Sequence, residues 1–118
     1  MDAQAIQDIF SPVIPVRVRR MFGGFGVFDG EMMFALVFDG TFFLKTTPAT
    51  RAHFAAAGSD AFVYRGRGRE RDLGYWRLPE AALDDPDELA RWTKLAVQAA
   101  LDSARLRRRG SRPRPLPP

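Results

Sequence analysis

Hydrophobic residues in the first half of the chain fall into runs that are separated by Asp-Gly pairs. Three apolar runs between residues 20 and 45 are divided by Asp29-Gly30 and Asp39-Gly40. Asp-Gly between apolar runs is a strong hairpin signal, because a type I′ turn needs positive φ at both central residues and glycine adopts it without steric cost. This pattern predicts a three-stranded antiparallel meander around which the rest of the chain is organised.

The central run of this meander is the most apolar part of the chain. Residues 32–38 are seven apolar residues without interruption, which predicts a central strand covered on both faces. Strict alternation places one set of side chains on one face and the other set on the opposite face. The first set is Met32, Phe34, Leu36 and Phe38, and the second is Met33, Ala35 and Val37.

Five further strands are indicated around this run, one of which is the last run of the meander at residues 41–45. From about Val16, valines alternate with arginines, and the glycines at 23–26 predict a bulge or sharp bend before a strand at 25–28. Residues 61–64 and 73–78 predict two strands joined by a loop from Arg65 to Arg71.

Three helices are predicted from periodicity and capping residues. A short one covers about residues 3–10; a second has Thr47 as its N-cap, begins at Pro48 and ends at Gly58; the last begins at Asp85 and continues to about Ser103. The element order is therefore α-β-β-β-β-α-β-β-α. We expect an α+β fold with an antiparallel sheet of about five or six strands and packed helices.

Length and charge separate a folded body from a tail. The chain of 118 residues has room for one domain, expected at residues 1–105, and residues 106–118 are rich in arginine and proline, which predicts disorder. The net charge of +4 comes from the end of the chain: residues 105–118 hold six arginines and no acid, and the remainder has more acidic than basic residues. The basic charge therefore describes a tail more than a binding face of the body.

The expected location is the cytoplasm. The chain has no cysteine, its beginning lacks the pattern of a signal peptide, and no segment is long and apolar enough to span a membrane.

Candidate chemistry is sparse. Residues 23–26 are not followed by the third glycine of a dinucleotide fingerprint, and no Gly-Lys-Ser/Thr occurs. His53 is the only histidine, and no serine stands in a Gly-x-Ser-x-Gly motif. Phe25 and Phe28 beside glycines partly match an RNA-recognition strand, although packing in the core is the stronger interpretation. We therefore predict no enzymatic activity, no metal and no cofactor.

The run Arg19-Arg20-Met21-Phe22-Gly23-Gly24-Phe25-Gly26, with Phe43-Leu44-Lys45, Thr50-Arg51 and Tyr75-Trp76 further on, resembles the N-terminal domain of the TfoX/Sxy family of competence regulators. The resemblance covers about residues 5–100. It implies an α+β fold similar to secretion chaperones and a role in activating transcription of DNA-uptake genes together with the cyclic-AMP receptor protein. The family's regulators carry a second domain, and this chain has an arginine-proline tail in its place.

The resemblance favours a regulatory or protein-interaction module, with a transcription factor as one candidate partner. The predicted partner-binding residues are the motif positions Arg19, Arg20, Met21, Phe22, Gly23, Gly24 and Lys45.

Nucleic-acid binding is the alternative function, because arginine can neutralise phosphate. It would use the loop residues Arg65, Arg67, Arg69 and Arg71 and the tail residues Arg107, Arg108, Arg109, Arg112 and Arg114.

Self-association is also expected. Three helices, of which one is short and one is mostly alanine, would leave part of the sheet open, and soluble monomers rarely expose a large apolar patch. A homodimer would close that face.

Overall fold

A computed structural model describes the chain at residues 1–21, 23–66 and 69–111, with side chains described except at 64–66, 69–73 and 108–111. The expected α+β class and element order are confirmed, with one additional short helix, α3, before the last helix. The elements are α1 (Ala3–Phe10), β1 (Arg17–Met21), β2 (Gly24–Asp29), β3 (Met32–Phe38), β4 (Thr41–Lys45), α2 (Pro48–Ala56), β5 (Ala61–Gly66), β6 (Arg69–Arg77), α3 (Ala81–Asp84) and α4 (Pro86–Ser111).

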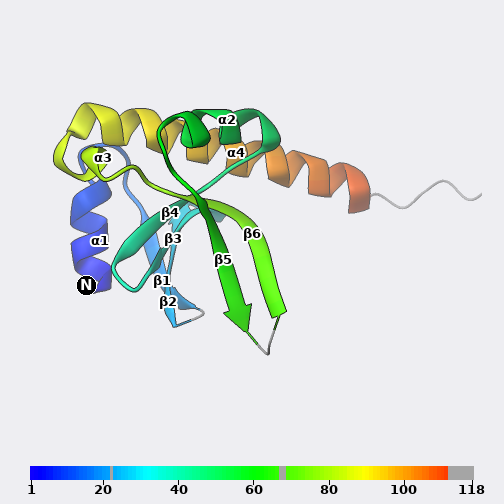
Figure 1. The fold of residues 1–118 in the computed structure, drawn as a ribbon. Coiled ribbons are helices and arrows are strands. Elements are labelled where there is room, and N and C mark those ends of the chain that lie inside the picture. Colours follow the sequence, from blue (N-terminus) through cyan, green and yellow to red (C-terminus); the bar gives the residue numbers. More distant parts are fainter. Residues whose placement is uncertain (22, 67–68, 112–118) are drawn as a thin grey trace, which may run out of the picture.

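The strands form one six-stranded sheet in the order β1-β2-β3-β4-β6-β5, in which every neighbouring pair is antiparallel. The predicted central strand β3 pairs on both sides. Figure 1 shows α2, α3 and α4 together above the sheet and the hairpin β5–β6 projecting away from them. The sheet therefore has a helix-covered face and an opposite face, which we call the far face.

The main core lies between the helices and the sheet. α1 contributes Ile6 and Phe10, both fully buried, and the Phe10 ring meets Phe34 of β3 edge-on with 5.5 Å between centroids. Trp92 of α4 packs against Phe54 of α2 at 4.6 Å. The small residues that follow Trp92 on the same face of α4 let this helix approach the sheet closely; they are Ala96, Ala99 and Ala100, all buried.

A β-bulge changes the faces predicted for β3. Val27 of β2 pairs with Ala35, and the next residue, Phe28, pairs with Met33, so Phe34 is the extra residue. Because a bulge breaks strict alternation, Phe34 lies in the helix-side core together with Ala35 and Val37, while Leu36 packs with Met33 on the far face. The prediction that Phe34 shares a face with Leu36 was wrong.

The far face is partly covered by the same chain. Leu36, Phe62 and Tyr75 form a second buried cluster, 4%, 8% and 5% exposed, and the Phe62 ring contacts Phe43 at 4.6 Å between centroids. Phe38, at one end of this face, is 36% exposed. The middle of the apolar surface from which we predicted a homodimer is thus closed within one chain, and self-association remains a prediction.

The two predicted Asp-Gly turns differ in detail. Asp39 and Gly40 both have positive φ, +52° and +74°, between the paired residues Phe38 and Thr41, as a type I′ turn requires. In the other hairpin Asp29 still pairs with Met32, so the turn is Gly30-Glu31 and only Gly30 has positive φ.

Helix starts follow the predicted caps. The Thr47 side chain accepts a hydrogen bond from the Thr50 backbone N–H, and the Thr50 hydroxyl oxygen accepts one from the Thr47 backbone N–H. Asp85 Oδ1 accepts hydrogen bonds from the N–H groups of Asp87 and Glu88. Each cap satisfies backbone donors that the first helical turn leaves unpaired.

Two segments are more regular than predicted. The expected loop from Arg65 to Arg71 is largely the end of the β5–β6 hairpin, in which Arg65 pairs with Glu70 and Gly66 with Arg69. α4 continues through the expected tail as far as Ser111, because arginine and leucine are good helix formers even where no core is available. Residues 112–118 lie outside the described residues. None of the described helices has the length and apolar character of a membrane span.

Candidate functional site

The structure explains the glycines of the Arg-Met-Phe-Gly-Gly motif by backbone geometry. Gly23 has φ +77° at the turn between β1 and β2. A methyl group added at Gly24 would overlap the carbonyl oxygen of Val37 on β3. Met21 packs in the far-face cluster. Met21, Gly23 and Gly24, three of the predicted partner-binding residues, therefore have a structural role in the fold. Phe22 lies outside the described residues.

The arginines of the motif are exposed on β1, an edge of the described sheet, together with Arg17. We call Arg17, Arg19 and Arg20 the arginine strand. Arg19 lies over the ring of Phe28, with 5.9 Å from its guanidinium carbon to the centroid, and Arg20 lies over Phe25 at 6.0 Å. Because successive residues point to opposite faces, Arg19 and Arg20 present charge on both sides of this edge. Contact with the aromatic faces holds each guanidinium close to the sheet.

Lys45, the last predicted partner-binding residue, lies at the end of β4 away from the glycines. It pairs with Tyr75 of β6, and its ammonium lies 5.0 Å from the centroid of the Tyr75 ring. Burial, followed by repulsion from Arg107 and Arg51, lowers the pKa of Lys45 below its ordinary value of 10.5. Burial also raises the pKa of Tyr75 to about 12, against a smaller opposing effect of Arg107. Lys45 is thus a half-buried cation beside two others and a neutral phenol.

A cavity of about 410 Å³ opens beside these two residues. Strands β2, β3, β4 and β6 and the C-terminal part of α4 all contribute to its wall. Its polar lining consists of Lys45, Tyr75, Arg107 and Glu31. We call this cavity the basic pocket.

Arg51 of α2 completes the cationic group. Its Nε donates to Thr46 Oγ1 at 3.2 Å, and the Thr46 hydroxyl donates to the Gly74 carbonyl oxygen at 3.0 Å. A methyl group at Gly74, which has φ +78°, would lie 3.6 Å from Lys45 Nζ and 3.9 Å from an Arg51 Nη atom. The Lys45 ammonium and the Arg51 guanidinium therefore both lie next to Gly74.

Sequence reasoning identified only part of this pocket. It assigned Lys45 to partner binding and Arg107 to nucleic-acid binding, and it did not name Arg51 or Tyr75 as site residues. Both stand within the family-like matches Thr50-Arg51 and Tyr75-Trp76. The family resemblance was therefore the signal that could have identified these two residues. Their positions along the chain gave no such signal, because Lys45 and Tyr75 meet only through the β4–β6 pairing.

The remaining predicted nucleic-acid residues cannot be assigned to a surface. The side chains of Arg65, Arg69 and Arg71 and of Arg108 and Arg109 lie outside the described ones, as do residues Arg67, Arg112 and Arg114 entirely. Arg107 alone of that set has a described side chain. Among the described residues, no three His, Asp or Glu side chains gather as a metal site would require.

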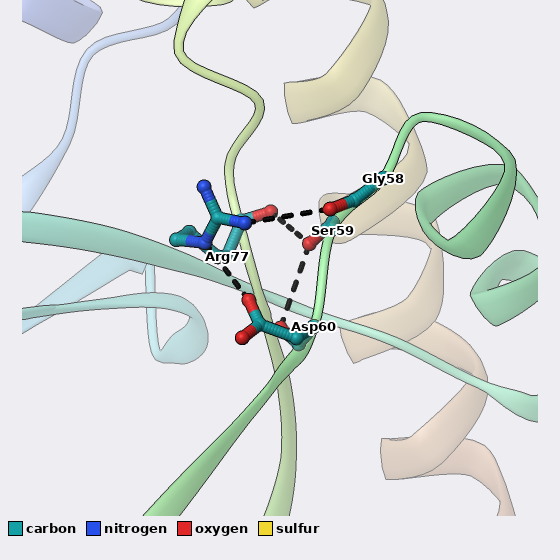
Figure 2. A network of polar contacts seen from close by, with 4 residues as sticks. All are labelled: Gly58, Ser59, Asp60 and Arg77. Carbon is teal, nitrogen blue, oxygen red and sulfur yellow. Dashed lines mark hydrogen bonds and ion pairs between the residues drawn. The ribbon is translucent and has the colours of Figure 1, made fainter.

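A second polar network has a structural role. Arg77 Nε forms an ion pair with Asp60 Oδ1 at 2.8 Å, and the Ser59 hydroxyl donates to the Arg77 carbonyl oxygen. Figure 2 shows these groups closing around the connection from α2 to β5, with Arg77 also reaching the Gly58 carbonyl oxygen. The network holds the connection from α2 to β5 against β6. The hydrogen-bonding groups of the network are paired with one another.

This fold and its motif place the chain in a known class. The family model of the TfoX N-terminal domain matches residues 8–100, so the chain belongs to this family. It is 24% identical over 111 residues to Protein Sxy of Escherichia coli (strain K12), a match covering 94% of this chain and 53% of that protein. It is 30% identical over 90 residues to DNA transformation protein TfoX1 of Aliivibrio fischeri, covering 76% of this chain and 41% of the relative. The chain spans about half the length of the curated relatives it matches.

Proposed function

We propose that this chain is a non-enzymatic regulatory module that acts by binding a protein partner, and that its role is related to competence control. The family match over residues 8–100 carries this proposal. One relative is named a DNA transformation protein, and we extend that role to this chain as control of genes for DNA uptake. A transcription factor is the expected kind of partner.

The arginine strand is the surface we assign to the partner. Arg17, Arg19 and Arg20 are exposed on an edge strand. An edge offers unpaired backbone groups to an incoming segment, and the arginines select an acidic one. Of the described motif residues, Arg19 and Arg20 are the ones whose charged side chains the core leaves exposed, and Arg17 is exposed two positions before them, which supports recognition by charge at this edge.

The test combines a genetic and a binding measurement in the native cell. Deletion of the gene should lower transcription of DNA-uptake genes, and wild-type protein should restore it. A variant with Arg17, Arg19 and Arg20 changed to Glu should fail to restore it and should lose the co-purified partner, because three attractive contacts become repulsive. Arg91→Glu is the matched control, since Arg91 is an exposed arginine on α4 away from β1.

Unchanged transcription after deletion would contradict the competence role. Retention of the partner by the triple variant would contradict the assigned surface.

Nucleic-acid binding is distinguished by its salt dependence. If β1 and the arginines of the hairpin and tail contact phosphates, affinity for a DNA duplex falls steeply as salt is added, with a slope set by the number of phosphates neutralised. The protein-partner proposal predicts that purified chain has only weak affinity for DNA at physiological salt. Tight duplex binding under those conditions would favour the alternative.

A further inference from the structure

Lys45 and Arg107 of the basic pocket, and Arg51 beside Lys45, carry positive charge that no ion pair among the described side chains offsets, unlike two other cations of the described chain. Arg77 pairs with Asp60 at 2.8 Å and Arg91 with Glu88 at 2.9 Å. Among the residues whose side chains are described, Lys45, Arg51 and Arg107 form no ion pair with a carboxylate, although Glu31 lines the same cavity. Three cations therefore lie at this site with one described carboxylate, that of Glu31, and none of the three forms an ion pair with a described carboxylate.

This arrangement is unfavourable without an anion. Lys45 is half-buried, so its ammonium has lost part of its hydration, and the neighbouring guanidinium groups repel it. The Tyr75 ring face and the hydroxyl of Thr46, already engaged by Arg51, offset only part of that cost. Partly desolvated cations that rigid elements hold close together are typical of a ligand-binding site. An oxyanion would offset the repulsion and would compensate for the lost hydration with direct ionic contacts.

The rest of the cavity suits a small organic molecule. Its volume of about 410 Å³ lies within the usual range of small-molecule sites, roughly 300–1,000 Å³. Beside the charged groups the wall is apolar, formed by Phe28, Met32, Met33, Ala100 and Ala104. Methionine side chains adapt to flat or irregular ligands and contact aromatic rings favourably. The cavity thus has both a charged part and an apolar part.

We infer that the basic pocket binds a small organic phosphate of about mononucleotide size. Lys45 and Arg107 contact the phosphate oxygens, and the Tyr75 hydroxyl is available as a neutral donor at the same end. The methionines and Phe28 contact the organic part. Arg51, held by Thr46, contributes charge next to Lys45. This inference concerns a different surface from the arginine strand and does not depend on the proposed protein partner.

The site is tested by calorimetric titration of the full chain with adenosine monophosphate and with inorganic phosphate, in phosphate-free buffer of constant ionic strength. We expect saturable binding of adenosine monophosphate that is tighter than that of inorganic phosphate. Lys45→Met and Arg107→Met should each weaken it about tenfold or more, because a charge-assisted hydrogen bond is lost. Arg91→Met, on the same helix as Arg107 but outside the pocket, should bind as wild type does.

Arg107 is exposed near the end of α4, so its variant keeps the test valid if Lys45→Met fails to fold. Backbone amide NMR locates the ligand: signals of Lys45, Gly74 and Tyr75 should shift on titration.

Four results would overturn the inference. They are absence of saturation by either probe in the low-millimolar range, equal affinity for the two probes, equal weakening in Arg91→Met, and displacement of adenosine monophosphate by a short DNA duplex. The last would assign the cations to the phosphates of nucleic acid.

Discussion

The substitution Gly24→Ala separates a structural role of the glycine motif from a role in recognition. The added methyl group would overlap the carbonyl oxygen of Val37 and would lie 3.2 Å from the Cα of Phe38. These are backbone atoms of the central strand β3, which pairs on both sides and cannot rotate away as a side chain does. The β2 strand must therefore shift away from β3 near this residue.

The cost can be bounded from the packing. Overfilling a well-packed site costs about 1–3 kcal/mol, and an obstacle made of backbone belongs at the upper end of that range. Replacing glycine by alanine in a strand recovers about 0.5–1 kcal/mol of conformational entropy. We expect a net loss of about 2 kcal/mol in the free energy of unfolding, which is a substantial part of the roughly 5–15 kcal/mol typical of a domain.

Gly26→Ala is the matched control on the same strand. Its methyl group would lie 2.8 Å from the Sδ atoms of Met21 and Met33. These are the ends of flexible side chains that can move, so we expect a loss of less than about 1 kcal/mol.

Urea unfolding and thermal unfolding, each followed by circular dichroism, measure both variants. The slope with denaturant should be unchanged, and the melting temperature should fall by about 4 °C per kcal/mol. Equal stability of Gly24→Ala and wild type, or a larger loss in Gly26→Ala, would refute the reasoning and would return Gly24 to the list of recognition residues.

Three further predictions concern the pocket, a helix cap and assembly. The Tyr75 pKa of about 12 exceeds its ordinary value of 10.0, so between these pH values the folded chain holds a proton that the unfolded chain loses. Stability should fall with rising pH in that window by at most about 3 kcal/mol, and ultraviolet titration of a Tyr64→Phe variant should show phenolate forming only near pH 12. Phenolate formation near pH 10 without unfolding would contradict the burial. Thr47→Ala should cost about 1 kcal/mol in urea unfolding, because the cap of α2 is lost; Thr50→Val should cost a similar amount, and no loss in either would contradict the capping role. Light scattering at micromolar concentration should show a dimer; a mass that stays at 13.3 kDa as concentration rises would rule it out.

The local elements could be read from the sequence because their causes are local. Asp39-Gly40 forms its turn because those two residues supply the positive φ that the turn needs. Thr47 and Asp85 begin helices because their side chains reach backbone donors within the next three residues. The apolar run 32–38 became the central strand for the same kind of reason, since its length and hydrophobicity suit a strand covered on both faces.

Tertiary structure decided what depends on neighbouring strands. The bulge that turns Phe34 toward the helices exists only where β3 pairs with β2, and alternation within one strand cannot reveal it. The requirement for glycine at position 24 comes from the Val37 carbonyl of another strand. The covering of Leu36 likewise needed Phe62, which the hairpin β5–β6 brings to the far face.

The candidate site was decided by tertiary structure for the same reason. The sequence by itself determined that Lys45 ends a strand and that arginines follow the last core residues of α4. Only the pairing of Lys45 with Tyr75 and the path of α4 past the end of the sheet bring Lys45 and Arg107 to one cavity, with Arg51 next to Lys45. Electrostatic repulsion and desolvation depend on distance and burial in space, so charge along the sequence located a basic tail and could not locate the basic pocket.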